Sequence, residues 1–284
     1  MMVFRYWVLL CLAFTVTSGC AFSPKAGEGF RDVPYGKHER QVYDVYVPKN
    51  ATDAPVIFMV HGGAWRAGDK TNRAVVKHKV KRWLPKGVVI ISTNYRLLPD
   101  ADPVEQARDV ARAIAHAQKN ASQYGANPKQ FILMGHSAGA HIISLLNADF
   151  SMAQSKGAQP WLGAVSIDFP EFNIEKLMQD DPAWFYRAAF GEHDVFWREA
   201  SPYHRLEKRA APLLAIYSTK RKDKPETQIL AFAQHAQSLG LKVETLPVAL
   251  SHTAANSELG KDNDYTVEVE AFLKRLDASF NSRL

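Results

Sequence analysis

The sequence predicts an α/β fold in which a mostly parallel β-sheet carries helices on both faces. The first observation is a pair of continuous runs rich in β-branched residues at 56–60 and 88–92, after which further strands are predicted at 131–134, 164–167, 213–217 and 242–246. Continuous runs of this kind are typical of parallel strands that are buried on both faces. The second observation is that segments with helical signals separate these runs, and this alternation favours a doubly wound sheet.

The helices are predicted from their boundary residues and their apolar spacing. Residues 71–83 form a candidate helix that Pro85 and Gly87 would stop. Asp102-Pro103 is a favourable helix start, and apolar residues recur at helical spacing from 104 to 114, so this helix is expected to reach about 124. Before all of these segments, residues 42–47 show enough alternation of apolar and polar side chains to predict an edge strand, which would end at Pro48.

The segment 169–204 is longer than a plain connection between two strands requires. It is rich in aromatic residues, which could form a small lid over a pocket or could pack the segment against the sheet. Both interpretations stay open, and each can hold for different rings. The aromatic residues are Phe172, Trp184, Phe185, Tyr186, Phe190, Phe196 and Trp197.

A G-x-S-x-G motif at residues 135–139 is the most informative local pattern. It follows the apolar run 131–134 and precedes a helical run at 140–146. Strand, G-x-S-x-G and helix is the setting of a nucleophile elbow, where the serine hydroxyl stands exposed at a strained turn. Glycines are needed there because side chains would strike neighbouring backbone. Ser137 is therefore the predicted nucleophile.

A second motif supports this interpretation. The strand at 56–60 runs directly into His61-Gly62-Gly63-Ala64-Trp65. Loops of the H-G-G type supply backbone N–H groups to an oxyanion hole, and small residues let those groups approach a developing alkoxide closely.

With both motifs, the chain resembles α/β-hydrolases of the hormone-sensitive-lipase and carboxylesterase type. It is especially similar to BD-FAE-like and arylformamidase-like esterases, whose loops read HGGxW and GHSAGAH. The match includes residues 68–70, 94–96 and Asp109, and it extends from about Tyr43 to the C-terminal helix. Ala64 stands where glycine is more usual. The resemblance implies an α/β-hydrolase domain over residues 30–284, with 169–204 as a lid-like insertion.

A serine nucleophile needs a base, and the base needs an orienting carboxylate. The chain order in this fold is Ser, acid, His. His252 follows the last predicted strand, where the resemblance places the base. Asp223 follows the strand 213–217 and occupies the acid position that the resemblance implies, although its loop is unusually basic. Glu226 is the first rival for the acid and Asp168, at the end of an earlier strand, is the second.

The resemblance then implies ester hydrolysis through an acyl-enzyme. The oxyanion would be held by the backbone N–H groups of Gly63, Ala64 and Ala138, and no metal or organic cofactor would be needed. The substrate would be a small ester or amide. Two alternatives stay open: an amidase of the arylformamidase kind, and a catalytically silent surface lipoprotein that keeps the fold as a binding module.

Composition and the first residues bear on location. The chain has 284 residues and a net charge of +6, with basic residues too scattered to predict nucleic-acid binding. Residues 1–19 have the shape of a signal peptide, because a basic residue precedes a short apolar run. Small residues before Cys20 resemble a lipobox, although Thr17 stands where leucine is usual. This resemblance predicts a lipid anchor on Cys20, a tether at 20–29 and a place in the bacterial cell envelope. An ordinary cleaved signal peptide and an uncleaved anchor stay open as alternatives. The other cysteine, Cys11, would be removed, so no disulfide is expected.

Overall fold

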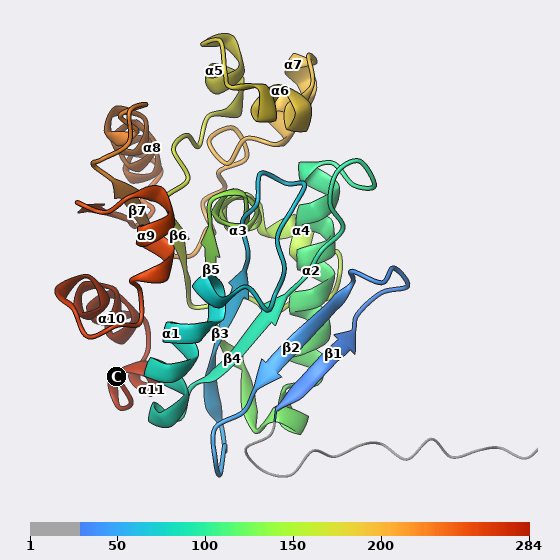
Figure 1. The fold of residues 1–284 in the computed structure, drawn as a ribbon, viewed down its shortest axis with the longest axis vertical. Helices are drawn as coiled ribbons and strands as arrows, with labels where there is room; N and C mark the ends of the chain where they lie inside the picture. The colour runs from blue at the N-terminus through green and yellow to red at the C-terminus, as the bar shows by residue number, and fades with distance from the viewer. Residues whose placement is uncertain (1–28) are drawn as a thin grey trace, which may run out of the picture.

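The computed structural model describes residues 29–284, so the predicted signal peptide, Cys20 and nearly all of the tether lie outside the described residues. An eight-stranded sheet runs through the molecule in the order β1-β2-β4-β3-β5-β6-β7-β8 (Figure 1). The strands from β3 to β8 pair in parallel, as predicted. Their bounds are Phe30–Pro34, Val42–Tyr46, Ala54–Val60, Val89–Thr93, Ala126–His136, Gly163–Ile167, Leu213–Ser218 and Val243–Val248 for β1 to β8.

Helices cover both faces of this sheet. The longer ones are α1 (Arg73–Trp83), α2 (Pro103–Lys119), α3 (Ala138–Ala148), α8 (Glu226–Ser238) and α10 (Asp264–Leu276). The start of α2 follows the predicted chemistry, because the Asp102 carboxylate accepts hydrogen bonds from the N–H groups of Val104 and Glu105. The remaining helices are short: α4 (Phe150–Gln154), α5 (Ile174–Gln179), α6 (Trp184–Phe190), α7 (Asp194–Glu199), α9 (His252–Ser257) and α11 (Ala278–Asn281).

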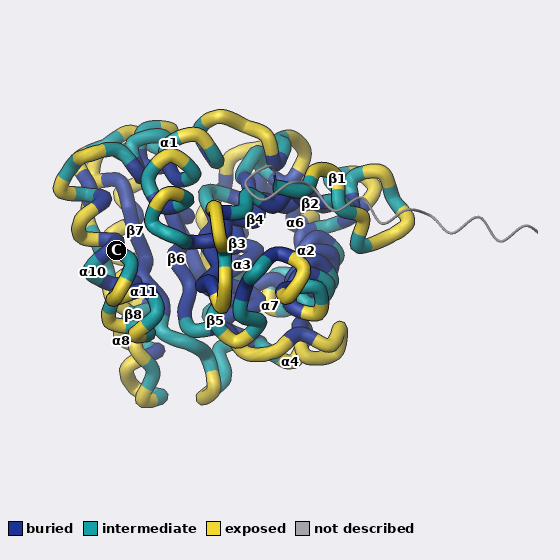
Figure 2. The backbone as a smooth tube through the Cα atoms, turned by 90° about the horizontal axis from the view of Figure 1, so that it is seen from below, coloured by how far each residue is buried: buried dark blue, intermediate teal, exposed yellow. Residues whose placement is uncertain are grey.

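The core lies on the two faces of the sheet. Along β3, Val56, Phe58 and Val60 belong to one buried cluster, whereas Ile57 and Met59 belong to the other. Successive side chains of a strand point to opposite faces, so this division follows from the strand geometry. Figure 2 shows the strands buried at the centre and the outer turns and loops exposed. Buried strands of this kind fix the positions of the loops at their carboxyl ends.

One prediction about the sheet edge was wrong. The strand expected at 42–47 is β2, but it is not the edge, because β1 pairs with it in antiparallel orientation. β1 is half-exposed, with Arg31, Asp32 and Pro34 facing solvent. Its apolar content is therefore too low for the sequence to predict a strand there.

The segment between β6 and β7 holds α5, α6 and α7, which lie beyond the carboxyl ends of the parallel strands (Figure 1). Its aromatic rings divide between two roles. Phe172 and Phe190 are buried in the core, and Phe185 and Tyr186 line a cavity beside Ser137. Trp184 is 66% exposed. No helix within residues 29–284 combines the length and apolarity that crossing a membrane requires.

Candidate active site

Ser137 lies in a strained turn between β5 and α3. Its φ of 55° and ψ of −123° fall in a sparsely populated region, and such a conformation costs roughly 1–3 kcal/mol. The surrounding structure holds it there, because the Ser137 N–H donates to the carbonyl of Ile167 at 2.9 Å. Ser137 therefore stands at the carboxyl edge of the sheet, where ligands bind in α/β folds. Strained backbone of this kind concentrates at functional sites.

Close backbone packing explains the glycines of this turn. A Cβ built on Gly139 would lie 2.3 Å from the Val60 carbonyl oxygen and 2.5 Å from that of His61. A Cβ on Gly62 would lie 2.9 Å from the Ser137 Cβ. The two predicted motifs are thus packed directly against each other, and neither glycine can gain a side chain without moving backbone.

Gly139→Ala is therefore expected to lower the free energy of unfolding by about 1–3 kcal/mol, the usual cost of overpacking. Gly157→Ala is the control: its added Cβ would meet nothing within 4 Å. The control is expected to lower the free energy of unfolding by about 1 kcal/mol, because alanine is disfavoured at the positive φ of residue 157. Urea denaturation of both variants measures the two losses, and a Gly139→Ala variant as stable as the wild type would show that the close approach to Val60 carries no cost.

The loop at residues 61–65 turns sharply above β3. Ala64 and Trp65 both have positive φ, 50° and 59°. The Tyr95 hydroxyl donates to the His61 carbonyl at 2.7 Å, and the Trp65 indole N–H donates to His141 Nδ1 at 3.2 Å. Among the described residues, no acceptor takes the N–H of Ala64. Ala138 is the first residue of α3, so its N–H has no partner within the helix either.

His252 and Asp168 form a close pair at the same edge of the sheet. The Nδ1 atom of His252 lies 2.6 Å from Oδ2 of Asp168. Asp168 directly follows β6, the neighbour of β5, and its Oδ1 accepts the N–H of Ser218 at 2.8 Å. The Asp168 side chain is fully buried, whereas that of His252 is 39% exposed. The imidazole is thereby fixed on one side and open to the cavity on the other.

The prediction that Asp223 orients His252 was wrong. Asp223 lies five residues beyond the end of β7, is 49% exposed, and binds the guanidinium of Arg221. The physical reason is the position of Asp168. This residue directly follows β6, which pairs with the strand that leads into Ser137, so its carboxylate reaches His252 without an intervening loop. In the sequence, Asp168 is the second rival of Asp223 for the acid of the triad. Its direct succession to the 164–167 strand was the signal in its favour.

The electrostatics favour an ionised Asp168. Burial alone would raise the pKa of its carboxyl, but hydrogen bonds from His252 and Ser218 and the charge of Arg221 outweigh burial and lower it. The ring of His136 lies 4.6 Å from that of His252, and its Nε2–H donates to the His252 carbonyl. Burial, with the charge of His252, lowers the pKa of His136 to about 3, so His136 stays neutral.

The other motif histidines are structural parts of their loops. Burial lowers the pKa values of His61 and His141 to about 4. His61 stacks on Tyr95 with ring centroids 4.5 Å apart, and His141 Nε2–H donates to the Ala200 carbonyl at 2.7 Å. Since neither ring is paired with a carboxylate in the described part of the chain, both serve to fix the loops that surround Ser137.

A buried lysine supports the helix that begins at His252. The Lys79 ammonium donates to the carbonyl of Asn256 at 2.7 Å, to its side-chain Oδ1 at 2.9 Å and to the carbonyl of Ala74. No carboxylate within residues 29–284 pairs with Lys79. Burial therefore lowers its pKa to about 7. Lys79 links α1 to α9 through uncharged acceptors.

This lysine makes stability depend on pH. Between pH 7 and 10.5 the unfolded chain keeps the Lys79 proton and the folded chain releases it, so the free energy of unfolding rises with pH. The slope from one such group is about 1.4 kcal/mol per pH unit. Lys79→Met should remove this slope, and exposed Lys77→Met should keep it, in urea denaturations at pH 7.5, 8.5 and 9.5. Identical slopes in both variants would contradict the buried, neutral Lys79.

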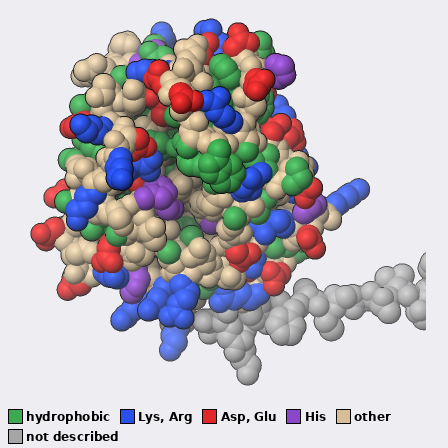
Figure 3. Space-filling view, turned by 45° about the horizontal axis from the view of Figure 1, so that its top comes forward, with side chains coloured by type: hydrophobic (Ala, Val, Ile, Leu, Met, Phe, Trp, Pro, Cys, Tyr) green, Lys and Arg blue, Asp and Glu red, His purple; other side chains and the backbone are tan. Residues whose placement is uncertain are grey.

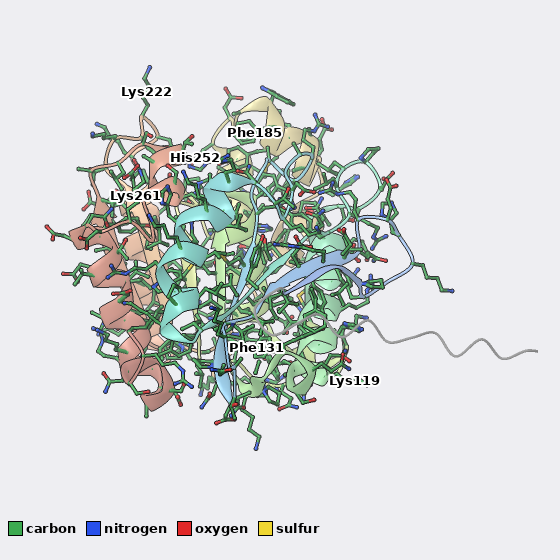
Figure 4. The ribbon with its side chains drawn as sticks, turned by 60° about the horizontal axis from the view of Figure 1, so that its bottom comes forward. Lys119, Phe131, Phe185, Lys222, His252 and Lys261 are labelled. Carbon is green, nitrogen blue, oxygen red and sulfur yellow. The ribbon has the colours of Figure 1, made fainter. Side chains whose placement is uncertain are left out.

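Two cavities meet at Ser137. One, of about 400 Å³, has an aromatic wall that includes Trp65, Phe169 and Tyr186. The other, of about 610 Å³, runs over the 61–68 loop toward α1 and α9. Ala64, Ser137, Phe185 and His252 line both. Figure 3 shows the hollow, with a histidine on one side and hydrophobic side chains on the other, and Figure 4 shows Phe185 and His252 close together at this end of the molecule.

The arrangement can perform acyl transfer: a hydroxyl on a strained elbow, a carboxylate-oriented imidazole, free N–H groups and a cavity on each side. Within the described part of the chain, no three His, Cys, Asp or Glu side chains gather as metal ligands would.

Comparison with known proteins gives one family match. Residues 43–162 match the BD-FAE family model. A probable isoprenylcysteine alpha-carbonyl methylesterase of Arabidopsis thaliana is 30% identical over 85% of this chain and 55% of its own length. The kynurenine formamidase of Danio rerio is 28% identical over 45% of this chain and 42% of its own. The chain spans about half the length of the curated relatives it matches.

Solved structures confirm the predicted fold. A truncated carbohydrate esterase from gut microbiota superimposes with a TM-score of 0.74, covering 87% of this chain and 95% of the other at 20% identity. At that identity the likeness concerns the fold. Together with the parallel sheet and the family match, it confirms the architecture that the two glycine-containing motifs predicted.

Proposed function

We propose that this chain, an α/β-hydrolase with a BD-FAE domain at residues 43–162, is a serine carboxylesterase whose triad is Ser137, His252 and Asp168. The observation that carries the proposal is the 2.6 Å pairing of His252 with buried Asp168 beside a serine in a strained elbow. The names of the esterase relatives support the same reaction class.

The proposed reaction has two halves. His252 Nε2 takes the proton of the Ser137 hydroxyl as Oγ attacks the acyl carbonyl, and the resulting imidazolium is stabilised by Asp168. His252 then protonates the departing alcohol, which leaves an ester on Ser137. Water, deprotonated by His252, attacks this acyl-enzyme and restores the serine.

The oxyanion that forms in each half needs hydrogen-bond donors. The backbone N–H groups of Gly63, Ala64 and Ala138 are the proposed donors, and the Ala64 and Ala138 N–H groups are uncommitted as described above. Each such donor stabilises the transition state by about 3 kcal/mol. Arg66 and Ala67 N–H groups bond to the Gly63 carbonyl, which supports a fixed loop for this purpose.

Hydrolysis of p-nitrophenyl acetate, butyrate and octanoate by the wild-type chain tests the function. The aromatic-walled cavity of about 400 Å³ fits a short acyl group, so kcat/KM is expected to fall from butyrate to octanoate. An N-formyl anilide in the same assay measures the amidase alternative, because the two activities share every residue named and differ in substrate fit. The absence of turnover on all four substrates would contradict the proposal and favour the silent binding module.

A further inference from the structure

Arg221 lies against the paired histidine and aspartate, where a triad needs no cation. Its Nη1 atom is 3.0 Å from Nδ1 of His252 and 3.4 Å from Oδ2 of Asp168. The Arg221 side chain is only 17% exposed, and it lines the same cavity as Ser137. The guanidinium is therefore a part of the site that the proposed reaction leaves without a role.

The contact between Arg221 and His252 is not a hydrogen bond when His252 donates to Asp168. In that tautomer both nitrogen atoms carry hydrogen and neither can accept. The two groups instead compete for one carboxylate oxygen of Asp168. Arginine forms strong charge-assisted hydrogen bonds with carboxylates, so a free guanidinium here would displace the imidazole.

Asp223 holds the guanidinium away from this competition. Nε of Arg221 donates to Oδ1 of Asp223 at 2.8 Å, and Nη2 donates to Oδ2 at 2.5 Å. This two-point pairing fixes the plane of the guanidinium. Burial opposes the charge of Arg221, but the hydrogen bond to Asp223 and the charge of Asp168 outweigh it and raise the pKa of Arg221.

We propose that Arg221 and Asp223 form a positioning unit for the triad, in which Asp223 restrains Arg221 and so leaves the Asp168 carboxylate free to orient His252. The inference rests on the proposed function. Asp223 thereby has a role that differs from the triad acid: it acts on His252 only through Arg221.

A double-mutant cycle on kcat/KM against pH tests the unit. Arg221→Gln is the reference variant, because it removes the cation that competes for Asp168. Asp223→Asn should lower the plateau about tenfold, as the loss of an orienting partner does, because the freed guanidinium binds Asp168. In the double variant the plateau should return to within about threefold of Arg221→Gln, since no cation remains to compete.

A readout independent of turnover separates this inference from the proposed function. The proton that His252 Nδ1 shares with Asp168 should give a downfield NMR resonance, assigned by its loss in His252→Ala. We expect this resonance to be lost or shifted upfield in Asp223→Asn and restored in the double variant. Two results would overturn the positioning unit even if Ser137-dependent hydrolysis is found. One is an equal fall of the kcat/KM plateau when Asp223→Asn is made in the wild type and in Arg221→Gln. The other is a His252 resonance that is unchanged in Asp223→Asn. If hydrolysis is absent, the NMR result alone decides.

Discussion

Ser137→Ala is expected to lower kcat for p-nitrophenyl butyrate by about 10⁶-fold, the loss typical of removing a triad nucleophile. Alanine keeps the backbone turn but offers no hydroxyl to attack the acyl carbonyl. Since the Ser137 N–H to Ile167 contact is made by the backbone, the fold should be retained. Steady-state kinetics, with a thermal melt to confirm folding, measures both quantities.

Ser144→Ala is the matched control for that substitution. Ser144 lies two turns further along α3, is buried, and its hydroxyl has no hydrogen-bond partner among the described residues. Its loss should leave kcat within about twofold of wild type, as for substitutions that remove no made contact. Retained activity in Ser137→Ala would contradict the assignment of the nucleophile, whatever the control does.

Asp168→Asn should lower kcat by about 10⁴-fold, because an amide no longer holds the imidazole in the tautomer that leaves Nε2 free to accept a proton. The loss should be the same in the Arg221→Gln background, in contrast to that of Asp223→Asn. Glu226→Gln is the control, because Glu226 is exposed and only accepts a hydrogen bond from the Tyr217 hydroxyl. An Asp168→Asn enzyme with near wild-type kcat would show that another carboxylate orients His252.

The sequence predicts Ser137 and His252 but cannot choose the acid. Ser137 is predictable because its function requires a local backbone turn, and the glycines and flanking elements that make the turn are neighbours in sequence. The acid is set by which side chain reaches Nδ1 of His252 across the sheet edge. Asp168 and Asp223 both satisfy the chain order, and only the placement of β6 beside β5 and the pairing of Asp223 with Arg221 decide between them.

The same distinction holds for the fold. Strands buried on both faces, such as β3 and β4, are predictable from continuous apolar runs. β1 was missed and β5 begins at Ala126, earlier than expected, because most of the residues concerned are polar or only partly buried. Their strand structure depends on pairing with a neighbour, which a single sequence does not reveal. Arg221 is likewise part of a loop that the sequence shows only as unusually basic, whereas the structure places it against His252.

Reaction with a fluorophosphonate is the most direct measurement of whether this site is a working serine hydrolase. Phosphonates react with a serine only when a base activates it and an oxyanion hole receives the developing charge. The expected result is one adduct per chain by intact mass, mapped to the peptide that contains Ser137, formed far more slowly in Asp168→Asn. An unmodified chain, or an adduct on any other residue, would contradict the Ser137, His252 and Asp168 triad.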